Sequence, residues 1–373
     1  MIKYILASGL FLITLAPHLF AQTCSDADVI AIKTKWVFDK DAYNRFQPGI
    51  TATLLKNVFE NTAAYKQLFI AAYPEPSGGL MKGYAYIVDQ TNYHIRGHAD
   101  YVYNATYFGY RCAKDKNEVI IDPEKLSINM AELRANNLRG VLEEVADSFE
   151  LNGKPVRVFR LAHALKDPRG FHSFEGLGHD NSIAVLFTHN DILPYRYLTR
   201  KEYLSMIKTY WEKLMKNGMA LVDEQEKQIL DMEASAKKDY TGELRENMLK
   251  ELNSQLEQYR KRKGANKQHL DSGIQQELDS IDYAFKHYSD KELREPAIPK
   301  ADDVYRGFIT EKEGGFYFVI LDSSYFKKNL PSYAAQTLVL QSYYLETEPG
   351  ALSWVKAIRE KFPYDKLKTL IDK

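Results

Sequence analysis

The chain of 373 residues has few cysteines, no net charge and, beyond its first 21 residues, no long apolar run. Its 50 basic and 50 acidic residues balance, so no overall electrostatic attraction draws it to nucleic acid or to an anionic membrane. No later apolar stretch approaches the ~20 residues that a membrane-spanning helix needs. We therefore expect neither a nucleic-acid partner nor a transmembrane segment in the mature chain.

The short motifs of several common enzyme classes are also missing. The sequence has no GxSxG nucleophile turn, no phosphate-binding GxxxxGK[ST] loop and no GxGxxG that opens a helix after a strand. A cysteine–histidine catalytic signature is missing as well. The sequence therefore assigns no catalytic residue, and it favours a protein that is not an enzyme.

The first 21 residues have the pattern of a secretory signal. Lys3 is their only charge, residues 5–15 form an apolar core, and Ala21 precedes a polar start at Gln22. The alternative is a membrane anchor, but Pro17 interrupts an apolar run that is already too short to span a bilayer. The pattern predicts export, with cleavage near Ala21, to the periplasm or the cell exterior.

Both cysteines, Cys24 and Cys112, follow the predicted cleavage site. In an oxidising compartment they can pair, which would close a long loop and tie the N-terminus to a strand. The alternative is two free thiols, because pairing requires a proximity that the sequence does not show.

The order of the apolar patterns predicts an α+β fold with a mainly antiparallel sheet. Apolar residues at helical spacing in residues 26–36 and 53–72 indicate N-terminal helices. Short alternating runs then follow one another through residues 83–198. Because most of these runs have no helical pattern between them, they favour antiparallel pairing over βαβ units.

At Thr199 the alternating pattern gives way to helical spacing. Thr199 and Glu202 form a capping-box pattern, which predicts that a helix begins there. Residues 200–263 carry 14 basic and 12 acidic residues, interspersed around a narrow apolar seam. This pattern is typical of a long helical hairpin or coiled-coil arm. We expect one or two breaks, at Gly218 and Gly242, and a turn at residues 263–266.

Strand patterns return after this helical region. Residues 304–310 and 316–321 flank a glycine-containing turn, residues 337–345 predict a further strand, and residues 352–362 predict a closing helix. Strands on both sides of the helices indicate one interrupted sheet, and the alternative is two separate sheets, which would give a similar pattern. The predicted organisation has four parts: signal peptide 1–21, N-terminal helices and sheet 22–198, helical insertion 199–292, and returning strands with a C-terminal helix 293–373.

Histidines and carboxylates are concentrated in residues 163–191. Imidazole and carboxylate are the ligands of zinc and other divalent metals, so this segment offers a candidate hydrolytic metal centre, and a divalent metal is the one cofactor that the sequence suggests. The alternative is a polar, glycine-bearing loop whose histidines form local hydrogen bonds. The candidate ligands are His172, Glu175, His179, Asp180 and His189, with His163 just before them.

Tyrosine is abundant, with 26 residues, and several tyrosines alternate along predicted strands. Tyr84, Tyr86, Tyr101 and Tyr103 are candidates to line a groove for glycan or peptide, because tyrosine offers apolar area and a hydroxyl. The alternative is that they are ordinary half-buried strand residues.

Three stretches carry a resemblance to other proteins: YPEPSGG at residues 73–79, residues 194–204 with their TRKEYL core, and residues 325–331. With these, the chain resembles uncharacterised exported proteins of the Bacteroidetes. The resemblance implies a cell-envelope setting and no known activity.

These patterns together favour a non-catalytic exported protein that binds or scaffolds another envelope component. In this hypothesis the helical arm provides the interaction surface, the partner is an envelope protein or an extracellular ligand, and the arm also offers a route to self-association. The alternatives are a metal-dependent hydrolase centred on residues 163–191 and a glycan or peptide binder that uses the tyrosine-rich sheet.

Overall fold

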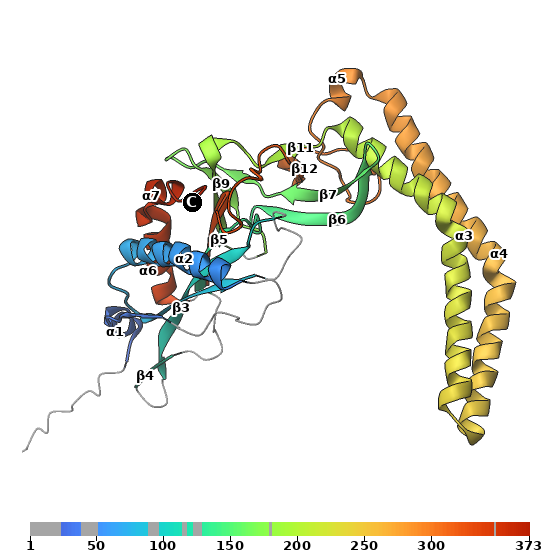
Figure 1. Cartoon of the computed structure of the whole chain (residues 1–373), viewed down its shortest axis with the longest axis horizontal. Helices are drawn as coiled ribbons and strands as arrows, with labels where there is room; N and C mark the ends of the chain where they lie inside the picture. Colours follow the sequence, from blue (N-terminus) through green and yellow to red (C-terminus); the bar gives the residue numbers. More distant parts are fainter. Residues whose placement is uncertain are drawn as a thin grey trace, which may run out of the picture.

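The computed structural model describes residues 24–38, 51–88, 97–113, 118–121, 129–178, 181–346 and 348–373. They form two mainly antiparallel sheets with flanking helices, from which a long helical hairpin projects (Figure 1). The predicted α+β fold is confirmed. The predicted signal peptide lies outside the described residues, and none of the described helices is long and apolar enough to cross a membrane.

The larger sheet has nine strands in the described part of the chain. All neighbouring strands are antiparallel except the edge pair β1 and β2. Strand β13, which follows the helical hairpin in sequence, lies between two strands that precede it. In spatial order the strands are β1 (Trp36–Phe38), β2 (Gly79–Ile87), β3 (Tyr101–Ala113), β5 (Asn129–Ala135), β13 (Thr337–Tyr343), β10 (Ile183–Thr188), β9 (His172–Glu175) and β8 (Ala164–Leu165), with β4 (Glu118–Ile121) beside β3.

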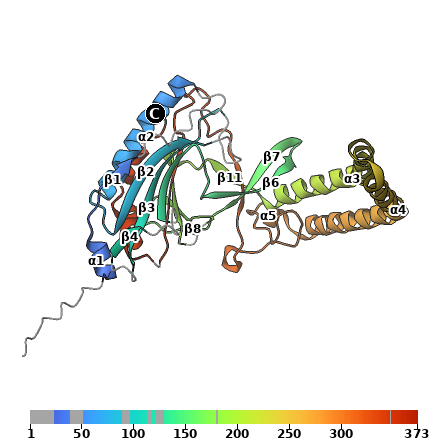
Figure 2. The same ribbon diagram turned by 90° about the horizontal axis from the view of Figure 1, so that it is seen from below.

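Helices cover one face of this sheet (Figure 2). They are α2 (Ala52–Ala72), α6 (Pro349–Lys361) and the short α7 (Tyr364–Lys368). The Phe69 side chain from α2 and the Trp354 side chain from α6 are fully buried there, and the Phe69 ring lies 5.3 Å from that of Tyr103 on β3. Burial of such large aromatic side chains makes this layer the main core of the protein.

The smaller sheet has the order β11 (Tyr195–Tyr197), β12 (Phe318–Leu321), β7 (Lys154–Leu161) and β6 (Leu142–Leu151). Its Phe159 and Val319 share a buried cluster with Leu186 and Val339 of the larger sheet. Each sheet combines strands from before and after the helical hairpin. The helices are therefore an insertion, as predicted. The strands before and after it join one another, in two sheets where one was expected.

The inserted hairpin consists of α3 (Arg200–Asp239) and α4 (Gly242–His287), followed by the short α5 (Asp290–Leu293). At about 1.5 Å per residue, α3 and α4 are about 60 and 70 Å long. We call these two helices the arm. The predicted helix start is confirmed: Thr199 Oγ1 accepts a hydrogen bond from the Glu202 amide at 3.1 Å, and Glu202 accepts one from the Thr199 amide at 2.9 Å.

The arm reverses at Tyr240 and Thr241, close to the break expected at Gly242, whereas α3 continues through Gly218. The predicted turn at residues 263–266 is wrong. Gly242 has a φ of +62°, a left-handed conformation that glycine adopts without strain. Helix α4 continues through residues 263–266, because a single glycine inside a helix costs only about 1 kcal/mol.

Two other predicted elements differ in the structure. Helix α1 (Asp26–Ala31) ends before Trp36, which lies instead in β1 and pairs with Met81 of β2. Residues 304–310 form no strand beyond an isolated bridge from Phe308 to Pro299, and Glu311–Glu313 form the 3-10 turn η3. In both places a tertiary contact determines the conformation: the Trp36 indole donates to the Tyr73 carbonyl at 2.9 Å, and Phe308 packs against Tyr203.

Candidate functional site

The arm is fixed to the smaller sheet by a buried root. Tyr203, on the first turn of α3, is fully buried, and its ring packs against Phe308 and Phe318 with centroids 5.8 and 5.6 Å away. Its hydroxyl donates a hydrogen bond to the Ala301 carbonyl at 3.0 Å. Ile281 of α4 is buried in the same cluster. Both helices therefore share one core with the sheet.

Ion pairs surround this root. Arg306 donates two hydrogen bonds to Glu277 of α4, at 2.6 and 2.8 Å, and Arg200 of α3 lies 2.9 Å from Glu295. Exposed ion pairs contribute little stability singly, but a two-pronged arginine–carboxylate contact constrains orientation. These contacts constrain the direction in which the arm leaves the two sheets; Figures 1 and 2 show the arm projecting from them.

Farther out, the arm has a very thin core. We call residues 223–262 the distal arm. Among its side chains that the structure describes, only Ala236, Leu252 and Leu256 are buried. Cross-helix ion pairs supplement this core, including a 2.7 Å pair between Arg260 and Glu226.

Large apolar side chains are exposed near the tip of the distal arm. Leu230 and Tyr240 are each 39% exposed, Met232 is 49% exposed and Leu244 is 58% exposed. We call these four residues the tip residues. Two helices alone cannot cover both of their apolar faces, so these side chains stay exposed and available for contact with a partner. The distal arm is therefore the main candidate interaction surface.

The predicted metal ligands are separated in the structure. The His172 ring lies 3.4 Å from the Asp191 carbonyl oxygen, whereas the His189 ring lies 2.8 Å from the Asp372 carboxylate, and Glu175 is exposed on β9. Nowhere in the described residues do three histidine, cysteine, aspartate or glutamate side chains form a group that could hold a metal ion. His179 and Asp180 lie outside the described residues.

Some residues of the segment 163–191 line a cleft of about 660 Å³, which we call the β9–β13 cleft. The His163 ring stacks on Phe316, with centroids 4.4 Å apart, and forms one aromatic part of the lining. The Glu175 amide donates to the His163 carbonyl at 2.9 Å, which fixes the two residues side by side. Tyr344 and Glu346, which follow β13, also line the cleft.

The four candidate tyrosines lie on opposite faces of the larger sheet. The β2–β3 register places Tyr84 opposite Asn104 and Ala85 opposite Tyr103. Tyr101 and Tyr103 are buried beneath the helices, whereas Tyr84 and Tyr86 stack on each other at 5.8 Å on the other face. The four tyrosines therefore do not line a single groove.

That second face also carries a buried ion pair that the sequence did not reveal. Glu132 and Arg134 on β5 are 7% and 5% exposed, and they contact each other directly. Asn104 of β3 donates to Glu132 at 3.0 Å. Polar residues at alternate positions of a strand usually mark a solvated face, so nothing in the sequence indicated this buried pair. Burial, with the charge of Glu132 as a second cause, raises the pKa of Tyr86 to about 12.

Asp100 lies just before β3 and is buried. Its burial leads us to expect an unusual pH dependence of the stability of the fold. It is 1% exposed, and burial raises the pKa of its carboxyl from 3.8 to about 7, although Asn137 donates a hydrogen bond to it. Between these pH values the folded state binds more protons than the unfolded state, so stability falls as pH rises, by at most about 1.4 kcal/mol per pH unit.

We therefore expect Asp100→Asn to be no more stable than the wild type near pH 4 and increasingly more stable toward pH 8. Urea denaturation of both proteins across this range measures the difference. If the unfolding free energies of the two proteins changed in parallel with pH, the raised pKa of Asp100 would be contradicted.

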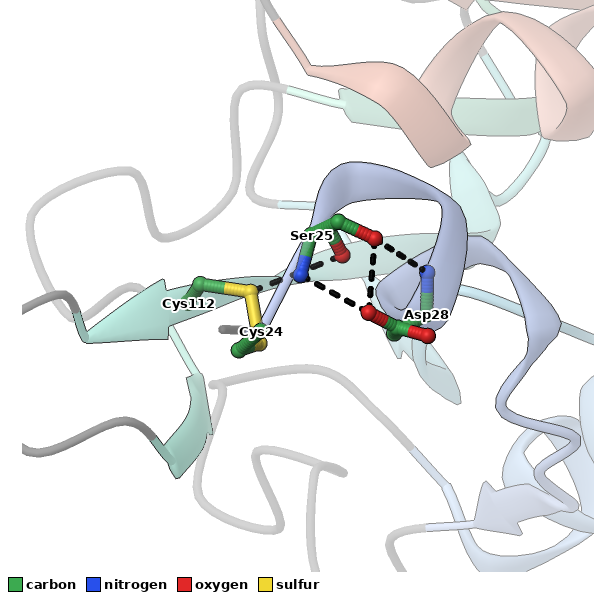
Figure 3. Close-up of a disulfide and its surroundings, with 4 residues drawn as sticks. All are labelled: Cys24, Ser25, Asp28 and Cys112. Carbon is green, nitrogen blue, oxygen red and sulfur yellow. Dashed lines mark hydrogen bonds between the residues drawn. A yellow bond between two sulfur atoms is a disulfide. The ribbon is translucent and has the colours of Figure 1, made fainter. Parts of the chain in front are cut away.

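Cys24 and Cys112 form a disulfide, as the sequence allowed, with their Cα atoms 5.6 Å apart (Figure 3). The bond joins the residue before the Ser25 cap of α1 to strand β3. Ser25 Oγ and the Ser25 amide both donate to Asp28, at 2.6 and 2.9 Å. These hydrogen bonds lower the pKa of the Asp28 carboxyl. The disulfide thus holds the start of the described chain against the sheet.

Removing this disulfide should lower stability substantially. The two cysteines are 88 residues apart, and a bond that closes so long a loop restricts the unfolded chain. We expect the Cys24→Ser, Cys112→Ser double variant to lose about 2–4 kcal/mol of unfolding free energy in urea denaturation. A reductant should destabilise the wild type by a similar amount and leave the variant unchanged, whereas equal stability of the two proteins under oxidising conditions would contradict the expectation.

Comparison with known proteins returned no matching family model, no matching curated protein and no matching solved structure.

Proposed function

We propose that this protein is an exported, non-catalytic binding or scaffold protein of the cell envelope. The two-sheet body serves as a platform, and the distal arm is the surface that contacts the partner. The observation that carries the proposal is the contrast between a root that is buried and ion-paired and a distal arm with only three buried side chains among those described.

The chemistry of the distal arm favours a protein partner with an apolar strip flanked by charges of both signs. The tip residues supply apolar area, and acidic and basic side chains such as Glu243 and Arg245 lie beside them in the sequence. Apolar contacts would supply most of the binding energy, and the mixed charges would select the register. A second helical hairpin or an amphipathic helix of the partner has this chemistry.

Site-specific photo-crosslinking in the native cells tests the proposal. A photoreactive amino acid at position 244 probes the tip, and the same amino acid at position 352 is the matched control, because Leu352 on α6 is 54% exposed against 58% for Leu244. We expect a discrete adduct with a different protein from position 244 and none from position 352.

Two results would contradict the proposal. The first is an absence of adducts from position 244, and the second is the same adducts from both positions. An adduct of twice the chain mass from position 244 would show self-association in place of a different partner.

A further inference from the structure

We propose that the β9–β13 cleft binds an organic cation, an ammonium or guanidinium group carried on an apolar stem. This site is separate from the distal arm and does not depend on the function proposed for it. The cleft volume of about 660 Å³ lies within the range of about 300–1,000 Å³ that is usual for small-molecule sites.

The charge of the cleft favours a cation. Two carboxylates, Glu175 and Glu346, line it, and both side chains belong to exposed residues. No lysine or arginine is among the described residues of its lining. Ionised carboxylates only accept hydrogen bonds, so the cleft suits a ligand with several N–H donors and a positive charge.

The aromatic part of the lining favours a cation with an apolar stem. His163 and Phe316 form a stacked pair, and Tyr343 and Tyr344 lie on the β13 side of the cleft. Aromatic faces attract cations within about 6 Å of the ring centroid and also cover methylene groups. An ammonium group alone would use only the carboxylates, whereas an alkylammonium or guanidinium side chain would use both kinds of lining.

Arg359 lies beside this lining and already has structural partners. The Arg359 guanidinium lies 5.6 Å from the Tyr344 ring centroid, and it donates to the carbonyls of Asn181 and Ser342 at 2.6 and 3.3 Å. Through these hydrogen bonds it stabilises the segment around the cleft.

Isothermal titration calorimetry of the complete mature chain tests the proposal with two probes. Cadaverine represents a free alkylamine, and tri-lysine represents the basic side chains of a peptide. We expect at least one probe to bind with a Kd of about 1 mM or tighter at low salt, and the affinity to fall as salt screens the carboxylates. Binding of both probes identifies a general alkylammonium site, whereas binding of tri-lysine alone identifies a peptide site.

The matched variants separate the cleft from general surface charge. The Glu175→Gln, Glu346→Gln double variant keeps the shape of both side chains and should weaken binding at least tenfold. Glu60→Gln, an exposed substitution on α2 across the larger sheet, should change the affinity less than twofold. The proposal is overturned if neither probe binds the wild type, or if the double variant binds as tightly. Because none of these residues lies on the arm, either outcome leaves the arm proposal to its own test.

Discussion

Removal of residues 227–259 should abolish partner binding while the rest of the protein stays folded. The variant joins Glu226 to Arg260 through a short glycine-containing turn, a connection that suits antiparallel helices. The excision removes all four tip residues and the three buried residues of the distal arm. The root is untouched, because Tyr203, Ile281 and their shared core lie outside the excised segment.

The measurement is the yield of the partner that co-purifies with the tagged chain after crosslinking in cells, compared with the yield from the wild type. We expect the yield to fall to background and the melting temperature of the body to change by no more than about 2–4 °C. A smaller change, Leu230→Ser with Met232→Ser and Leu244→Ser, should reduce the yield at least tenfold. Leu352→Ser, at an equally exposed apolar position on the body, should not reduce it. Full binding by the shortened arm would contradict the proposed function.

Replacing Glu132 with leucine should cost about 3–5 kcal/mol of unfolding free energy. The substitution leaves the Arg134 guanidinium buried, at 5% exposure, without the carboxylate that neutralises it. It also removes the oxygen that accepts a hydrogen bond from Asn104 at 3.0 Å. An unpaired buried charge costs much more than the ion pair contributes, because desolvation of the charge is no longer compensated.

A double-mutant cycle distinguishes this explanation from a simple packing defect. Glu132→Leu combined with Arg134→Met removes both charges and keeps similar side-chain volume, so most of the loss should be recovered. About 1 kcal/mol should remain for the hydrogen bond that Asn104 loses. Urea denaturation of the wild type, both single variants and the double variant provides the four values. If the double variant lost as much unfolding free energy as the two single variants together, the explanation by an unpaired charge would be contradicted.

Local patterns in the sequence predicted the start of the arm and much of the order of the elements. Thr199 and Glu202 are three residues apart, and the hydrogen bonds that they form are local, so the cap is visible in the sequence. The helical spacing of α2 and the alternation along β2 are local in the same sense. Predictions that depended on local spacing were therefore confirmed in these elements.

Predictions that depended on distant contacts were less successful. Residues 304–310 have a strand pattern, but Phe308 packs beneath Tyr203, about a hundred positions away, and the segment pairs only through an isolated bridge. The burial of Glu132 and Arg134 was not predicted, because no local pattern shows what covers a sheet face. His163 precedes the arm in the sequence and Phe316 follows it, so the sequence alone could not place the two rings in one cleft.

The thin core of the distal arm makes hydrogen exchange the most direct test of the central claim, that this segment contacts the partner. Backbone amides in helices with few buried contacts exchange quickly, and a bound partner slows them. In the purified complex, compared with the free chain, the account predicts slower exchange within residues 223–262 and unchanged exchange in the strands of the two sheets. Slower exchange confined to the body, with residues 223–262 unchanged, would contradict it.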